Sequence, residues 1–201
     1  MADNMFFSRD SKVFVAPLAA NGTEAGVWEI PVLDGFSFSQ ATNSSEVTLN
    51  EMSAGSNVSR RGRKMFNDSL APAEWSFSTY ARPFISAGTG TGAADDSANH
   101  HAVEEVLWGM TVGSAIQTGS AFEGFTLGTD DLDISFANSN KTSLGKANIY
   151  FTLGGTTGES AITYKIANCC VNEAGIDFDI DGIATINWSG LGTIITEQAA
   201  A

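Results

Sequence analysis

Cysteine, histidine and basic residues are all scarce in this chain of 201 residues. Its two cysteines, Cys169 and Cys170, are adjacent in a strand-like segment, where successive side chains point to opposite faces. A disulfide between them would distort the backbone, so we exclude a disulfide framework and expect two core or half-buried thiols. The two histidines, His100 and His101, each have a glutamate at i+4. On a helix these two pairs would point in different directions, which argues against zinc.

Long apolar runs are also absent. No stretch approaches the ~18 apolar residues that a membrane helix requires, and the N-terminus lacks the basic and apolar regions of a secretory signal. The chain has 10 basic residues against 23 acidic ones, and the resulting net charge of −13 repels nucleic acid and anionic membranes. We therefore expect a protein that is made in a cytoplasm and makes no contact with a membrane.

The residues that are present indicate a β protein. Hydrophobic residues make up 43% of the chain and charged residues 16%, which is a globular composition, and we see no repeat or domain boundary in 1–201. Most of the sequence consists of short alternating segments separated by Gly, Ser, Thr and Asn, typical of an antiparallel β-sandwich or barrel. The segments are SKVFVAP, VWEIPV, GFSFSQ, EVTLNEM, AEWSFSTYA, LDISFA, ANIYFTL, AITYKIA and a final hairpin.

One segment has a helical pattern instead. Val103, Val106, Leu107 and Met110 recur at i, i+3, i+4 and i+7, and the acids at 95–96 suit a helix N-terminus. We predict a single amphipathic helix over about residues 97–110, packed by that stripe against the sheets.

The segment IDFDIDG (176–182) has the first half of an EF-hand calcium loop, with aspartates at alternate positions before a glycine. Trp188 stands where calcium needs a bidentate acid, so the calcium interpretation fails. The alternation instead predicts a hairpin with the following IATINWSG, in which Phe178 lies opposite Ile186 and Ile176 opposite Trp188. One face would be apolar and buried and the other acidic and wet, the second carrying Asp177 and Asp179.

The few bases are concentrated in one segment. Four of the ten lie within five residues: Arg60, Arg61, Arg63 and Lys64. They belong to a long segment between two predicted strands, with Met65 and Phe66 beside them. Loops of that length are usually functional or disordered, and Arg, Met and Phe are enriched at interfaces.

The acids cluster elsewhere, notably as Asp130, Asp131 and Asp133. A mostly acidic protein with one basic finger suggests that the finger's partner is the protein's own surface. The net charge counts against the nucleic-acid or heparin site that a basic run otherwise indicates.

No catalytic constellation emerges from the sequence. The chain lacks a G-x-S-x-G elbow, and its GTGTG run (88–92) lacks the lysine and spacing of a nucleotide-binding loop. Paired carboxylates for glycoside hydrolysis are compatible with a β-sandwich. The acids here adjoin other acids, however, as on a solvated face. We expect no enzymatic activity, no cofactor and no metal.

Four long phrases resemble the major tail tube proteins of long-tailed bacteriophages: WEIPVLDGFSFSQATNSSEVTLNEMS, SRRGRKMFNDSLAPAEWSFSTYARPF, HHAVEEVLWGM and IDFDIDGIATINWSG. The resemblance runs from about residue 11 to about residue 195. It implies a mainly β, two-sheet antiparallel β-sandwich with one flanking helix at 97–110 and a long inter-strand loop at 51–73. In that family six subunits join their sheet edges into a ring, rings stack into a hollow tube that conducts the genome, and the long loop reaches a neighbouring ring. We expect one tail tube domain over 1–201, without a C-terminal immunoglobulin-like domain.

This resemblance gives the charge pattern a mechanism. Stacked rings make a head-to-tail contact that does not close, which produces filaments, and the basic finger would meet an acidic surface of the next ring. An acidic wall repels phosphates, so double-stranded DNA would pass through the lumen without specific binding. The lumen or ring-contact face would carry either Asp177 and Asp179 or the cluster Asp130, Asp131 and Asp133.

The resemblance also implies partners and a location. The partners would be other copies of the chain, a tape measure protein, a tail terminator and a distal tail protein, in a virion tail assembled in the host bacterial cytoplasm. Three alternatives stay open. The inner tube of a contractile injection or secretion system shares the fold and the ring. A secreted carbohydrate-binding β-sandwich would be monomeric, and a capsid decoration protein would form trimers or caps.

Overall fold

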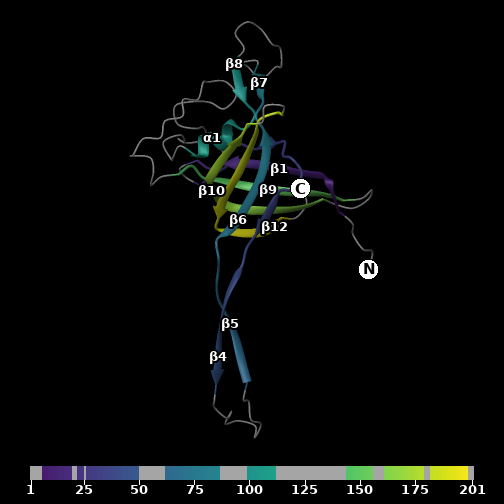
Figure 1. Cartoon of the computed structure of the whole chain (residues 1–201). Helices are drawn as coiled ribbons and strands as arrows, with labels where there is room; N and C mark the ends of the chain where they lie inside the picture. The colour runs from purple at the N-terminus through teal and green to yellow at the C-terminus, as the bar shows by residue number, and fades with distance from the viewer. Residues whose placement is uncertain are drawn as a thin grey trace.

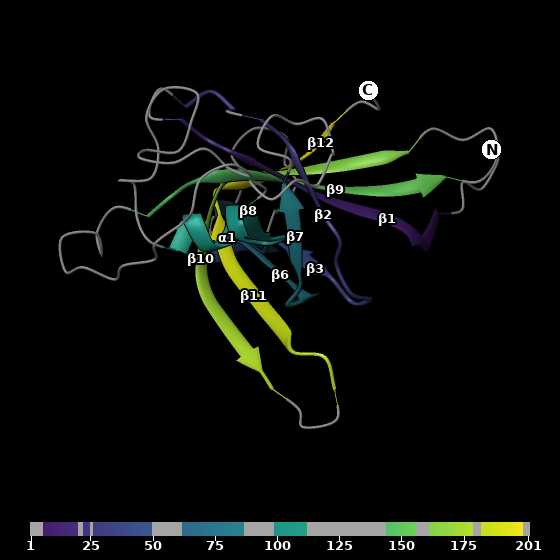
Figure 2. The same cartoon turned by 90° about the horizontal axis from the view of Figure 1, so that it is seen from above.

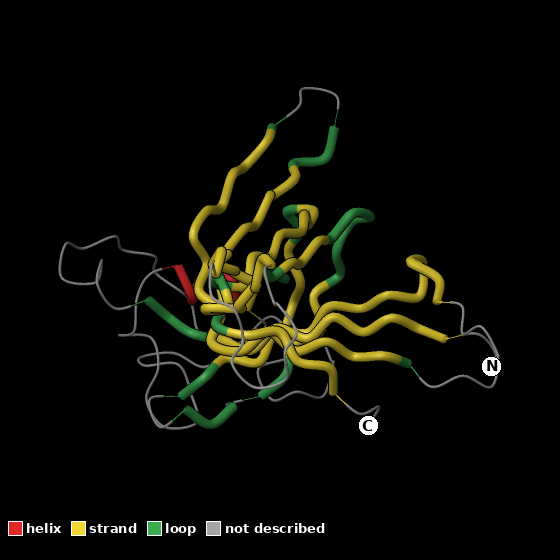
Figure 3. Tube along the Cα trace, turned by 90° about the horizontal axis from the view of Figure 1, so that it is seen from below, coloured by secondary structure: helices red, strands yellow, loops and turns green. Residues whose placement is uncertain are grey.

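The fold is built almost entirely from antiparallel strands, with one short helix beside them (Figures 1 and 3). The structure is a computed structural model that describes residues 6–19, 22–24, 26–49, 62–86, 99–111, 144–155, 161–178 and 182–198. Within these ranges the helix is α1 (Glu105–Thr111) and every other regular element is a strand, so the predicted mainly β fold is confirmed. None of the helical structure in the same ranges has the length and apolar character needed to cross a membrane.

The first layer of the sandwich combines strands from both ends of the chain. β1 pairs with β2 on one side and with β9 on the other, and β9 pairs with the first half of β10. β12 pairs with the other edge of that half. These strands are β1 (Phe6–Pro17), β2 (Trp28–Ile30), β9 (Ala147–Gly155), β10 (Ile162–Asp177) and β12 (Ile194–Gln198).

The second layer begins with the other half of β10. That half pairs with β11 (Thr185–Gly192), β11 pairs with β6 (Ala73–Tyr80), and β6 pairs with β3 (Ser37–Ser39). One eight-stranded sheet therefore runs in the order β2-β1-β9-β10-β11-β6-β3, with β12 beside β10. Because β10 belongs to both halves, the sheet turns over on itself there and forms the expected two-layer sandwich (Figure 2).

The facing sides of the two layers enclose the core. β6 and β11 alternate buried and more exposed residues, as a sheet with one wet face requires. The ring of Phe151 in β9 lies 4.8 Å from that of Phe38 and 6.5 Å from that of Phe77, which joins the layers through aromatic contacts. Buried residues of both layers and of α1 complete the cluster: Val13, Val15, Ile149, Ile166, Trp75, Ile186, Trp188, Val106, Leu107 and Met110.

The bend in β10 has a local cause. The pairing with β9 shifts register between Ile166 and Cys169, and Asn168 between them has a φ of 51°, a left-handed conformation that asparagine tolerates. On the neighbouring strand, Gly190 allows a close approach. A Cβ at this position would lie 2.1 Å from the carbonyl oxygen of Cys170 and 2.4 Å from the indole of Trp75. The packing at the corner therefore requires a residue without a side chain.

The helix is shorter than its apolar pattern predicts. Residues Asn99–Ala102 form strand β8, which pairs with β7 (Pro83–Ser86), so the predicted start at 97 is wrong and α1 begins at Glu105. Both histidines therefore lie on a strand, and no helix pairs them with the glutamates four residues later. The segment 99–102 (NHHA) has no large apolar side chain, and pairing with β7 satisfies its backbone instead. The later part of the stripe is right, because Val106, Leu107 and Met110 are fully buried.

Part of the predicted loop at 51–73 is a strand of a hairpin. β5 (Gly62–Leu70) lies inside the predicted loop and pairs with β4 (Thr42–Leu49), and β6 follows at Ala73. The loop therefore ends before Gly62, and its predicted C-terminal boundary at 73 is wrong. Figure 1 shows β4 and β5 extending away from the sandwich as a narrow arm. The sequence did not reveal β5 because neither of its faces has the apolar alternation that packing on a core produces.

The final hairpin forms, but its register differs from the predicted one. Ile176, rather than Phe178, lies opposite Ile186, and Ala174 lies opposite Trp188, a difference of two residues. Ile186 and Trp188 are buried as predicted, whereas Ile176 is 43% exposed and Phe178 is 81% exposed. The two strands continue past the main body of the sandwich (Figure 2), so the predicted buried face is wrong for the end of β10.

Gly190→Ala should destabilise the protein by roughly 1–3 kcal/mol, because the added methyl group must displace the Cys170 carbonyl or the Trp75 indole. Gly175→Ala is the matched control, since a Cβ there meets nothing within 4 Å. It should change the free energy of unfolding by less than about 1 kcal/mol. Urea denaturation measures both effects, and equal midpoints for the two variants would contradict the close approach at the corner.

Candidate assembly surfaces

The β4–β5 hairpin is exposed at the end nearer the sandwich. Residues 42–46 and 67–70 are all exposed, and Leu70 leaves 53% of its surface in water. Side-chain contacts link the strands: the Asn43 amide donates to the Ser69 hydroxyl at 3.2 Å, and the Ser45 hydroxyl donates to the Asp68 carboxylate. In the described ranges no third strand pairs with this hairpin. Because an isolated two-stranded hairpin is marginally stable in water, this arm is suited to acquiring a partner.

Three of the predicted contact residues lie on β5 of this hairpin. Arg63 pairs with Thr48, Lys64 with Val47 and Phe66 with Ser45. The other two, Arg60 and Arg61, lie outside the described residues. The basic finger is therefore at least partly a strand of a hairpin, and the contact role of its five residues stays a prediction.

One glutamine fixes the base of the hairpin to the sandwich. The Gln40 amide nitrogen donates to the carbonyl oxygens of Ala71 at 2.8 Å and Thr193 at 3.0 Å. Its amide oxygen accepts a bond from the Ile195 backbone nitrogen at 3.1 Å. Gln40 and Ala71 flank β4 and β5, while Thr193 and Ile195 belong to the corner between β11 and β12. This clamp could not be predicted from the sequence, because a single polar residue before a strand does not indicate a distant hydrogen-bond partner.

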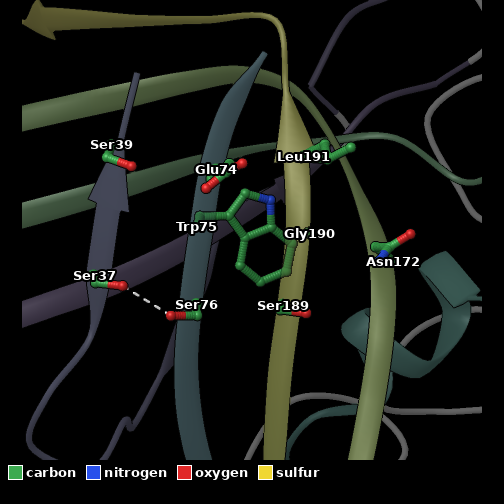
Figure 4. A pocket seen from close by; sticks show the side chains of 9 residues that line it. All are labelled: Ser37, Ser39, Glu74, Trp75, Ser76, Asn172, Ser189, Gly190 and Leu191. Atoms are coloured by element: carbon green, nitrogen blue, oxygen red, sulfur yellow. Dashed lines mark hydrogen bonds between the residues drawn. The ribbon is translucent and has the colours of Figure 1, made fainter. Parts of the chain in front are cut away.

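The outer face of the second layer is polar and acidic. A groove of about 320 Å³ lies on it, and the hydroxyls of Ser37 and Ser76, which line it, are hydrogen-bonded at 2.8 Å. Figure 4 shows the side chains that line this groove. Strands β3, β6, β11 and the second half of β10 carry no lysine or arginine. Their acids are all exposed: Glu74, Glu173 and Asp177.

Asp177 is the predicted acidic residue that the structure describes. It is exposed, and its carboxylate accepts a hydrogen bond from the Asn187 amide at 2.6 Å, while Asn187 in turn accepts one from Ser78 at 2.6 Å. These side chains place Asp177 on the same outer face as the groove. Asp179 and the cluster of Asp130, Asp131 and Asp133 lie outside the described residues.

The outer face of the first layer has a different electrostatic character. There the Glu24 carboxylate accepts hydrogen bonds from the Tyr150 hydroxyl, from the Asn148 amide at 2.5 Å and from the Lys165 ammonium group at 3.3 Å. Burial alone would raise the pKa of Glu24, but these bonds together hold it below its ordinary value. The negative charge of Glu24 is thus compensated by the positive charge of Lys165.

Glu104, directly before α1, is a buried carboxylate. It is 1% exposed, and its Oε1 has no hydrogen-bond partner among the described residues. Thr79 hydrogen-bonds to Glu104 and accepts a bond from the Trp188 indole nitrogen at 3.0 Å. Burial raises the pKa of Glu104 above its ordinary value, although its own backbone N–H, Arg82 and Thr79 act in the opposite direction.

The two cysteines are free thiols, Cys169 buried and Cys170 partly buried, which confirms the expected core positions. Burial raises the pKa of Cys169 to about 12, so its thiol stays protonated and unreactive at neutral pH. Within the described ranges, no three His, Cys, Asp or Glu side chains gather closely enough to hold a metal ion.

The two perturbed glutamates should give opposite pH dependences of stability. The folded state raises the pKa of Glu104 above 4.5, so its contribution is fully present below pH 4.5 and is lost as pH rises through the folded pKa. The pKa of Glu24 is lowered from 4.5, so its contribution is present above pH 4.5 and is lost as pH falls through the folded pKa. At neutral pH we expect Glu104→Gln to be more stable than the wild type and Glu24→Gln to be less stable. Urea unfolding across pH 3 to 8 measures this, and a shift in the same direction for both variants would contradict it.

Comparison with known proteins supplies a relative. No family model matches the chain. Over 184 residues, 92% of this chain, the sequence is 31% identical to the tail tube protein pb6 of Escherichia phage T5. The aligned part is 36% of pb6, so the chain spans little more than a third of the length of this relative.

Among solved structures, the chain is similar to the sheath/tube terminator of an extracellular contractile injection system named PVC. The alignment covers 99% of this chain and 100% of the other, with a TM-score of 0.53 and 10% identity. At this identity the likeness concerns the fold alone. The similarity to pb6, which extends over nearly the whole chain, confirms the resemblance to tail tube proteins expected from the sequence.

Proposed function

We propose that this protein is a structural subunit that polymerises as stacked rings into the hollow tail tube of a bacteriophage, through which the genome is delivered. The observation that carries the proposal is the β4–β5 hairpin, an exposed two-stranded arm on a chain similar to a phage tail tube protein. Such an arm lacks a core of its own and gains stability by docking on another molecule.

Stacking is the role that the hairpin supports. It leaves the sandwich at one end (Figure 1), so a contact between it and the opposite end of another copy would be head-to-tail and would not close on itself. Its Arg63 and Lys64 belong to the only dense group of bases in a chain of net charge −13. A basic arm meeting an acidic body favours one polarity of stacking and disfavours the reversed one, where like charges would meet.

Ring closure has a second set of candidate surfaces. In the described part of the chain, no strand pairs with the outer edge of β3, or with the outer edge of β10 beyond residue 170. These two edges bound the second layer. Joining the β3 edge of one subunit to the β10 edge of its neighbour would continue the sheet around a ring and would cover edges that otherwise promote aggregation. By resemblance to the family, the ring has six subunits.

The outer face of the second layer has the chemistry expected of the lumen wall. Glu74, Glu173 and Asp177 share it with serine and asparagine side chains and the exposed Leu191, and no base lies among them, so phosphates are repelled and DNA can slide. On the first layer, by contrast, acids are paired with bases, as in the Lys12–Glu29 ion pair at 3.1 Å. An uncompensated acidic face therefore distinguishes the side proposed to line the tube.

The other parts of the proposal follow from the family. Partners beyond other copies would be a tape measure protein inside the tube, a terminator at one end and a distal tail protein at the other, all in the virion tail. The fold also occurs in a contractile injection system. The sequence relative is a phage tail tube protein, however, which favours a phage tail over a contractile machine and over a carbohydrate-binding domain.

Negative-stain electron microscopy of the concentrated protein should show hollow filaments of uniform width with a regular axial repeat. Replacing Arg60, Arg61 and Arg63 by glutamate should leave a folded subunit that forms no filaments, because the arm would then repel the acidic body. The matched control replaces the same arginines by lysine and should still polymerise. Normal filaments from the glutamate variant would contradict the role of the arm, and a wild type that stays monomeric and binds glycans would favour the carbohydrate-binding alternative.

Glu74→Lys with Glu173→Lys should slow DNA ejection from virions at physiological salt, because the wall would then attract phosphates. Raised salt should partly restore the rate by screening. Glu29→Lys, a charge reversal on the first layer, is the control and should eject normally. Wild-type ejection from the double variant would mean that another face lines the lumen.

A further inference from the structure

An uncovered apolar surface lies where three strands of the second layer end together. Thr185 at the start of β11 pairs with Tyr80 at the end of β6 and with Asp177 at the end of β10. Large apolar side chains are exposed around this point: Tyr80 at 41%, Ile176 at 43%, Ile183 at 66% and Phe178 at 81%. We call these four residues the apolar end. Large exposed apolar side chains gathered at one end of a protein mark an interaction site.

The apolar end and the β4–β5 hairpin lie at opposite ends of the same strand. β6 begins at Ala73, two residues after the clamped Ala71 at the base of the hairpin, and it ends at Tyr80. Its pairing with β11 runs from Ala73 opposite Gly192 to Tyr80 opposite Thr185. Figure 1 shows β6 running from the base of the hairpin toward the other end of the sandwich. A strand of this length separates the two features by roughly 23 Å.

The two ends are complementary in residue type. β5 carries Arg63, Lys64, Met65 and Phe66 in succession, so bases adjoin apolar residues. The apolar end places exposed apolar side chains next to the exposed carboxylate of Asp177. A contact between them would bury apolar groups against each other and bring bases to an acid. Two identical ends meeting would instead oppose like charges.

We propose that the β4–β5 hairpin of one copy docks on the apolar end of a second copy, burying Phe178 and Ile183 in the contact between successive rings. This inference rests on the proposed function and names the surface that receives the arm. Complementary surfaces at opposite ends of one molecule make a heterologous contact that extends without limit along an axis. The ends of β10 and β11, which extend past the main body of the sandwich, would then form part of the contact between rings.

Disulfide crosslinking in assembled tubes tests the docking directly. Phe178→Cys is combined with Val47→Cys or with Thr48→Cys, which are opposite Lys64 and Arg63 and leave both bases in place. Successive side chains of a strand point to opposite faces, so the two double variants together test both faces of the hairpin. Mild oxidation of at least one double variant should give a ladder of linked chains that continues beyond the number of subunits in one ring. Leu144→Cys in place of Phe178→Cys is the matched control, since Leu144 is 38% exposed but lies beside α1, and should give no ladder.

The outcomes separate this inference from the proposed function. Tubes that form normally but give no ladder from either double variant, or a ladder that stops at one ring, would overturn the docking and leave the tube intact. Absence of filaments from the wild type would instead reject the tube itself. If Phe178→Cys folds but does not assemble while Leu144→Cys does, the apolar end is confirmed as an assembly surface. Ile183→Cys then replaces it in the crosslinking experiment.

Discussion

Backbone hydrogen bonding along β10 is the interaction on which the rest of the structure depends. The first half of this strand pairs with β9 and β12, and the second half pairs with β11, so one chain segment holds both layers in register. The core residues face each other only because the strand bends near Asn168. The close approach at Gly190 lets the Trp75 indole lie against that corner. The positions of the hairpin, the helix and the acidic face all follow from this arrangement.

The sequence predicts the parts of the fold in which one face of a strand is buried. β6 and β11 alternate strictly, because a shift of one residue would expose the core. The same alternation fails to fix the register of β10 against β11, since a shift of two residues keeps every side chain on its own face. Strands whose sequences lack apolar alternation, such as β5 (GRKMFNDSL), β7 (PFIS) and β8 (NHHA), leave no periodic trace. The first turn of the predicted helix was wrong because pairing with β7 satisfies the backbone of 99–102.

The candidate surfaces divide in the same way. The basic finger was found because its residues are consecutive in the sequence, and Asp177 because aspartates alternate around it. Groups of residues that only the fold brings together could not be predicted from the sequence. Glu74, Glu173 and Asp177 come from separate strands, and Gln40 contacts residues more than 150 positions away in the sequence. The alternating pattern that includes Ile176 and Phe178 predicts that both are buried, but the core ends before either residue. The local sequence pattern thus identified charged residues of the candidate surfaces, but it could not show at which residue the buried core ends.

The clamp at Gln40 has a consequence for the mechanics of an assembled tail. The amide of this one residue joins the hairpin to the main chain of the β11–β12 corner through its bonds to Thr193 and Ile195. A tensile force on the arm, as when a tube bends, therefore passes through the clamp to β12 and onward to β10, with which β12 pairs. Backbone bonds loaded in shear along paired strands share a force among many donors and acceptors. The clamp at the base of the hairpin therefore determines how stiffly the arm is held on the sandwich.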